Sequence, residues 1–225
     1  YFLAAFRSID GGLVRTFEIR DTGVAVADVM ANEDRQTLER VLIKNMTVGF
    51  NSRNYDLPLT MMAIRGFPIQ AIKRASDAII LHNAKPWDIE REYGFKVPQI
   101  NHVDLIEVAP GQASLKIYGG RLHAQRMQDL PFDPDALLTD DQVETLKRYC
   151  INDLDTTEGL FEHLLPQIEL RASMSEEYGQ DLRSKSDAQI AEAVIKSQFE
   201  KLTGNAPSRP IIKGGTSYRY RMPPL

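Results

Sequence analysis

The stretch from Thr47 to Pro58 constrains the fold most strongly. A short apolar run ends there in a polar turn, and Asp56 stands directly before Leu57-Pro58. This pattern predicts a buried strand that delivers Asn51 and Asp56 to its carboxyl end, where the next helix starts. Ligands bind at that edge in open α/β sheets. The alternative is that Asp56 only caps the following helix.

A second pattern lies on the clearest helix of the chain, which the capping box Thr139-Asp140-Asp141-Gln142 opens and which is predicted to run to Pro166. Tyr149 and Asp153 stand four residues apart on this helix, so both side chains project from one face. That face borders the apolar stripe, where an aspartate needs a metal ion, a cation or a hydrogen-bond network as compensation. Alternatively, Tyr149 packs at the edge of the core and Asp153 is solvated.

The remaining elements follow the order of an α/β fold. Strands are predicted over Tyr1–Arg7 and Leu13–Arg20, joined by hairpin residues Ile9–Gly12. Asn32 is predicted to cap a helix, and Ile100–Ile106 is predicted to be a buried strand. Further helices are predicted from Asp56 to Gly66, from Pro68 through Ile79, over Trp87–Tyr93, after Ser114, and from Ser186 to Leu202.

Charge and cysteine content exclude several classes of protein. A formal net charge of -4 argues against holding nucleic acid by bulk charge, but it is compatible with a nuclease that collects carboxylates around cations. The single cysteine, Cys150, excludes an internal disulfide and favours a reducing, cytosolic setting. It falls on an apolar helix stripe, as a core residue would. No histidine pair has zinc-binding spacing, and no apolar run is long enough for a membrane span or secretory signal.

Taken together, Asn-x4-Asp after a strand and Tyr-x3-Asp on a later helix resemble motifs II and III of the DnaQ-like 3′–5′ exonucleases. These are the proofreading domains of replicative DNA polymerases and have an RNase H-like fold. The details are most similar to exonuclease domains fused to phage-type DNA polymerases. The resemblance runs from Tyr1 to about Gln167. The similar segments are Phe50-Asn51 with Tyr55-Asp56-Leu57-Pro58, Ser114-Leu115-Lys116, Asp129-Leu130-Pro131, and Tyr149-Cys150-Ile151-Asn152-Asp153 ahead of Thr157.

The resemblance implies an α/β architecture with an RNase H-like mixed sheet flanked by helices. The exonuclease domain would span residues 1–170. Residues 171–225 would form a helical connector and a basic linker toward a polymerase domain in cis. The implied activity is the removal of nucleotides from the 3′ end of single-stranded or frayed DNA, in the cytoplasm or, for a phage protein, in the host cytoplasm.

The resemblance also implies a site with two divalent cations that are bound by hard oxygen ligands. The cations would be Mg²⁺, with Mn²⁺ as the alternative. Asp153 would bind the cation that activates the attacking water, and the Tyr149 hydroxyl would position that water. Asp56 would help to hold the second cation. Asn51 would contact the terminal nucleotide.

The chain departs from the family pattern at motif I, an Asp-x-Glu on the first strand. Asp10 lies in a Gly-Gly turn, and Glu18 has no partner carboxylate at the required spacing. We therefore expect the chain to begin just downstream of motif I and the site to be half present. Two alternatives stay open: a 3′–5′ exoribonuclease of the same fold, and a non-catalytic module that holds single-stranded DNA or a polymerase partner.

Overall fold

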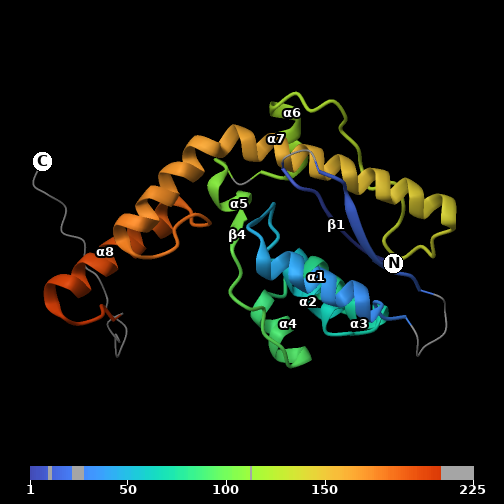
Figure 1. Ribbon diagram of the computed structural model, residues 1–225, viewed down its shortest axis with the longest axis horizontal. Helices are drawn as coiled ribbons and strands as arrows, with labels where there is room; N and C mark the ends of the chain where they lie inside the picture. Colours follow the sequence, from blue (N-terminus) through green and yellow to red (C-terminus); the bar gives the residue numbers. More distant parts are fainter. Residues whose placement is uncertain (10–11, 22–27, 112, 209–225) are drawn as a thin grey trace, which may run out of the picture. The chain divides into compact units, whose positions relative to one another are not determined.

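The computed structural model describes residues 1–9, 12–21, 28–111 and 113–208 (Figure 1). Two compact units are present, Tyr1–Ser186 and Asp187–Leu225, and the second contains α8 (Asp187–Thr203). The predicted turn residue Asp10 and the basic tail from residue 209 onward lie outside the described residues. The elements of the first unit are β1 (Phe2–Phe6), β2 (Arg15–Ile19), α1 (Asn32–Lys44), β3 (Thr47–Gly49), α2 (Asp56–Ile64), α3 (Ile69–His82), α4 (Pro86–Tyr93), β4 (His102–Asp104), α5 (Leu105–Val108), α6 (Leu115–Arg121) and α7 (Asp140–Tyr178).

The predicted N-terminal hairpin is confirmed. β1 and β2 are antiparallel, with Phe2 opposite Ile19 and Phe6 opposite Arg15. Phe17 and Ile19 alternate along β2 and are buried in a core that they share with α1, α2, α3 and α4. β1 also contacts α7 (Figure 1). Arg7, directly after β1, forms an ion pair with Asp155 of α7 at 2.6 Å. The hairpin is therefore held between the helical core and α7.

The buried strands that flank the candidate site are parallel. β3 and β4 pair from Thr47 opposite His102 to Gly49 opposite Asp104, so their carboxyl ends meet at one edge. The prediction of a strand over Ile100–Ile106 is wrong at both ends, because β4 covers three residues and α5 follows directly. Asp104 ends the strand, since its carboxylate accepts the Ile106 N–H and caps α5.

The fold is mixed α/β. Within the described ranges the strands form two separate two-stranded sheets, one antiparallel and one parallel, and the predicted RNase H-like mixed sheet is not confirmed. The second core lies beneath β4 and includes Val103, Tyr118 and Leu160, which bring together β4, α6 and α7. None of the described helices combines the length and apolar character that a membrane crossing requires.

Two predicted helix boundaries are wrong. α1 begins at Asn32 itself, and the N-cap position is Ala31, which supplies no side-chain bond. α7 starts at the predicted capping box but continues through Pro166 to Tyr178, where Gly179 in the left-handed conformation ends it. Pro166 costs the helix one hydrogen bond. The flanking Leu164 and Ile168 are buried in the second core, and this packing keeps the segment helical.

The segment after α7 belongs to the first unit. Arg171 is buried and donates a hydrogen bond to the carbonyl of Lys185. Ser184 Oγ accepts the Asp104 N–H at 2.9 Å and donates to the His102 carbonyl at 3.0 Å. The compact unit therefore ends after Ser186, whereas the boundary predicted at residue 170 falls inside α7.

Candidate active site

The turn between β3 and α2 presents the first predicted site residues. Asn51 has a φ of 57°, a left-handed conformation that asparagine tolerates better than most residues. The turn closes through the Asn54 N–H on the Asn51 carbonyl, and the Asn54 amide also donates to Asn51 Oδ1 at 2.8 Å. Gly49 is needed here, because a Cβ at this position would lie 2.5 Å from Ser52 Oγ. The sequence thus shapes a tight turn with the amide of Asn51 fixed by its neighbour.

A buried histidine supports this turn from beneath. His102 is 3% exposed, and its two ring nitrogens contact Thr47 Oγ1 at 2.8 Å and Ser52 Oγ at 2.7 Å. Burial, with a smaller contribution from the charge of Arg53, lowers the pKa of His102 to about 4. Ser52 and His102 are therefore hydrogen-bonded to each other in the protein interior, and we assign this pair a structural role.

Asp104 also lies at this edge, and no role was predicted for it. It is 1% exposed, and its carboxylate accepts the backbone N–H groups of Asn51 at 2.7 Å and Arg53 at 2.9 Å. Burial raises the pKa of Asp104, and these N–H donors oppose that rise. One feature of the sequence could have indicated a role for Asp104: it stands between the apolar residues Val103 and Leu105, at the end of a predicted buried strand.

Asp56 is the first residue of α2, and it does not cap the helix. The N-cap position is Tyr55, and no side-chain bond caps it. The Asp56 side chain is exposed, yet the surrounding protein restricts the hydration of the carboxyl. This desolvation, followed by the negative charge of Asp104 and then that of Asp153, raises the pKa of Asp56 to about 7. Because no side-chain bond caps α2, the capping interpretation does not describe Asp56.

The second predicted pair faces this region from α7. The Tyr149 hydroxyl donates a hydrogen bond to the Asp153 carboxylate, as their four-residue spacing predicts. Burial raises the pKa of Asp153, and the Tyr149 bond opposes that rise. The neighbouring Cys150 has a pKa raised to about 11, mainly by burial and further by the charges of Asp153 and Asp56. The thiol therefore stays protonated near neutral pH, in agreement with its prediction as a packing residue.

The structure therefore brings together residues that are far apart in the sequence. Asp56 and Asp153 lie close enough for their charges to repel, and Asp104, whose charge also acts on Asp56, accepts the backbone N–H of Asn51. In the part of the chain that the structure describes, no group of three or more His, Cys, Asp or Glu side chains has the geometry to hold a metal ion. Asp104 is already engaged by backbone donors, which leaves two carboxylates for a cation.

Two carboxylates fit part of a magnesium site. Mg²⁺ keeps several of its waters and is commonly bound by one or two carboxylates together with substrate phosphates. Burial and neighbouring negative charge raise the pKa of Asp56, and burial raises the pKa of Asp153, so a bound divalent cation would favour the charged form of both carboxylates. The donor set thus suits one cation, and a second would need further ligands.

Neutralising Asp56 is expected to stabilise the fold. The folded-state pKa lies above the ordinary value of 3.8, so the stability from protonating Asp56 is present at low pH and is lost as pH rises through about 7. For Asp56→Asn we expect a free energy of unfolding about 1 kcal/mol higher at pH 8, a figure reduced for solvent screening of an exposed group. Urea unfolding of both proteins at pH 5 and pH 8 measures this. A loss of about 1 kcal/mol would show instead that the carboxylate stabilises the start of α2.

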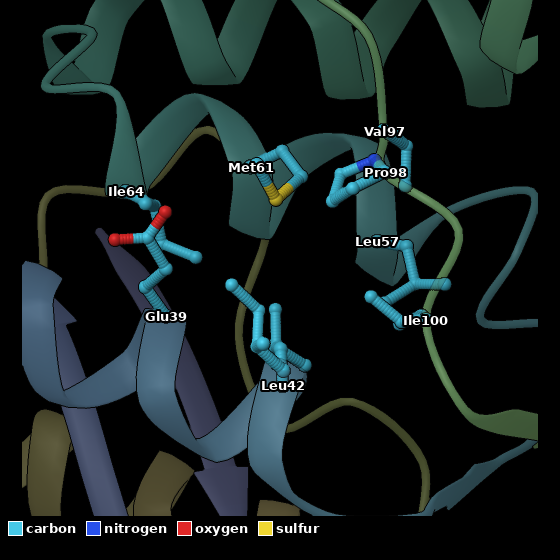
Figure 2. Close-up of a pocket in the computed structure, with 9 residues that line it drawn as sticks. Glu39, Leu42, Leu57, Met61, Ile64, Val97, Pro98 and Ile100 are labelled. Carbon is cyan, nitrogen blue, oxygen red and sulfur yellow. The ribbon is translucent and has the colours of Figure 1, made fainter.

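A small apolar pocket lies outside this site, among α1, α2 and the segment 97–100 (Figure 2). Leu42, Met61 and Ile100 point into it, and Glu39 contributes a charged side chain to its lining. Its lining includes none of the four predicted site residues. The pocket therefore gives no support to the chemistry considered for the carboxylates.

Comparisons with models of protein families, with curated proteins and with solved structures found no match to this chain. The function below is accordingly inferred from the chain's own residues and their geometry.

Proposed function

We propose that this chain is the 3′–5′ exonuclease part of a DNA polymerase and acts on single-stranded or frayed DNA 3′ ends. One observation carries the proposal. Asp56, after β3, and Asp153, on α7, approach closely enough that charge repulsion contributes to the raised pKa of Asp56. Proteins place unneutralised carboxylates together at a cost, and catalytic sites are where that cost is commonly found.

The elements around the carboxylates are consistent with an RNase H-like fold, which we propose for the exonuclease. The hairpin β1–β2 is antiparallel and the pair β3–β4 is parallel, and the proposed mixed sheet would contain both kinds of pairing, although the described strands form two separate sheets. The carboxyl edge of the parallel pair holds Asp104 and leads into the turn before Asp56. This is the edge at which α/β folds bind ligands.

In the proposed reaction Asp56 and Asp153 would hold Mg²⁺ or Mn²⁺. When bound, such a cation activates a water and stabilises the oxygen that leaves the phosphorus. The Tyr149 hydroxyl, fixed by its bond to Asp153, would orient the attacking water. The Asn51 amide, whose oxygen accepts from Asn54, would donate its N–H groups to the terminal nucleotide. A two-cation site would need carboxylates beyond these two.

A comparison of nucleic-acid substrates tests the proposal. The protein encoded by the complete gene is incubated with Mg²⁺ and with DNA or RNA strands of the same base sequence. We expect the DNA to be shortened and the RNA to be cut more slowly. Faster cutting of the RNA would identify an exoribonuclease instead.

A second candidate is a non-catalytic module that holds single-stranded DNA or a polymerase partner. The observation that favours it is that both carboxylate oxygens of Asp104, the third carboxylate near this edge, accept backbone N–H groups. Binding of the same DNA strand in the presence of EDTA, without hydrolysis when Mg²⁺ is restored, would establish this function and exclude the exonuclease.

A further inference from the structure

We propose that Asp104 is a positioning residue, which fixes the turn that carries Asn51 and through it sets the place of Asp56 at the start of α2. The inference rests on the proposed exonuclease function. It goes beyond that function by assigning a role to a carboxylate that contacts neither the cation nor the DNA in the proposed site.

The carboxylate of Asp104 accepts three backbone N–H groups, two from the turn after β3 and one from α5. Its Oδ1 accepts the N–H of Asn51 at 2.7 Å and that of Ile106 at 3.4 Å, while Oδ2 accepts the N–H of Arg53 at 2.9 Å. The end of β4, the start of α5 and the turn after β3 are thereby attached to one side chain. Because the side chain is 1% exposed, water cannot replace these bonds without opening the structure.

The turn that Asp104 holds also connects to Asp56. The carbonyl of Ser52 accepts the N–H of Leu57 at 2.8 Å, so the turn residues form the entry to α2. The left-handed Asn51 lies between β3 and this entry, and a backbone in that conformation needs its surroundings to hold it. The two N–H bonds to Asp104 are such a restraint, and they lie on both sides of Ser52.

Asp104 is itself held from the opposite side. Its own N–H donates to Ser184 Oγ at 2.9 Å, and Ser184 also donates to the His102 carbonyl at 3.0 Å. The carboxylate is therefore positioned by β4 and by the segment after α7. With both oxygens engaged by backbone donors, Asp104 is suited to hold a loop rather than to bind a cation.

Asp104→Asn tests the assignment, because the amide group keeps the shape of the side chain while its nitrogen cannot accept the Arg53 N–H. Hydrogen exchange of the Arg53 amide is expected to become at least about tenfold faster, the equivalent of one lost hydrogen bond. In the complete protein, kcat on a single-stranded DNA is expected to fall about a hundredfold, since small displacements of a catalytic group have effects of this size.

Val103→Ala is the matched control. It removes volume from the core at the adjacent, fully buried position but leaves the Asp104 carboxylate intact. It is expected to lower stability and to leave kcat and the Arg53 exchange rate unchanged. Equal losses of kcat in both variants would show that Asp104 matters only through stability and would overturn the assignment.

The two proposals fail in different ways. If the wild-type protein hydrolyses no DNA, the proposed function is wrong, and the exchange of Arg53 in Asp104→Asn still decides whether the carboxylate holds the turn. If the variant does not fold, the wild-type chain decides by itself: slow exchange at both Asn51 and Arg53 supports the assignment, and exchange at the rate of an open loop overturns it.

Discussion

Replacing Asp153 with alanine is expected to abolish hydrolysis of a DNA 3′ end and to leave the fold intact. The loss should be at least about a thousandfold, because charge stabilisation by a bound cation contributes several kcal/mol to the barrier and Asp153 is one of its two proposed ligands. The fold should be unaffected, since burial already disfavours the charged form of this half-buried carboxylate. Steady-state hydrolysis and thermal unfolding of the complete protein measure the two quantities.

Asp155→Ala provides the control on the same helix. Asp155 is exposed and pairs with Arg7 on the hairpin side of α7, so its removal takes away a similar charge without touching the Asp153 environment. This variant should hydrolyse DNA at the wild-type rate. The assignment of Asp153 fails if Asp153→Ala keeps its activity, or if both variants lose activity to the same degree.

The second large effect is a loss of stability in mild acid, caused by His102. Its pKa in the folded protein is about 4, below the ordinary value of 6.5, so the neutral form is the one that the fold stabilises. That stability is complete above pH 6.5 and is lost as pH falls toward about 4. The expected loss is about 3 kcal/mol, from 1.36 kcal/mol for each pKa unit. The difference in urea unfolding between the wild type and a variant without His102 across this pH interval measures it, because protonation of Asp56 changes the stability of both proteins in the opposite direction.

His102→Gln isolates this contribution, because a glutamine amide can bond to both Thr47 and Ser52 but does not titrate. The variant should be less stable than the wild type at pH 7, and its stability should change less between pH 6.5 and 4. Parallel stability curves for the two proteins would show that the acid sensitivity arises from other groups and that His102 is not the buried neutral base described here.

Local patterns in the sequence predicted much of the secondary structure. The hairpin of β1 and β2, the start of α6 after Ser114, the capping box at Thr139 that opens α7, and the end of α4 at Tyr93 are all confirmed. Each of these depends on residues that are close together in the chain, where hydrophobic period and capping chemistry decide the outcome. The spacing of Tyr149 and Asp153 likewise predicted that their side chains would meet.

Tertiary contacts decided what the sequence could not predict. α7 passes through Pro166 because the residues around it are buried in a core that local patterns do not show. Asp104 was placed on a predicted strand without a role, since its partners Asn51 and Arg53 lie some fifty positions earlier and are backbone groups. Donors of this kind are present in every sequence and so leave no signal in residue type.

The most direct test of the exonuclease proposal is to follow a single-stranded DNA labelled at its 5′ end in the presence of the complete protein. On addition of Mg²⁺ we predict a ladder of products that shorten one nucleotide at a time from the 3′ end, and EDTA should stop the reaction. Internal cuts, loss of the 5′ label as the first product, or a ladder that forms equally in EDTA would contradict the proposal.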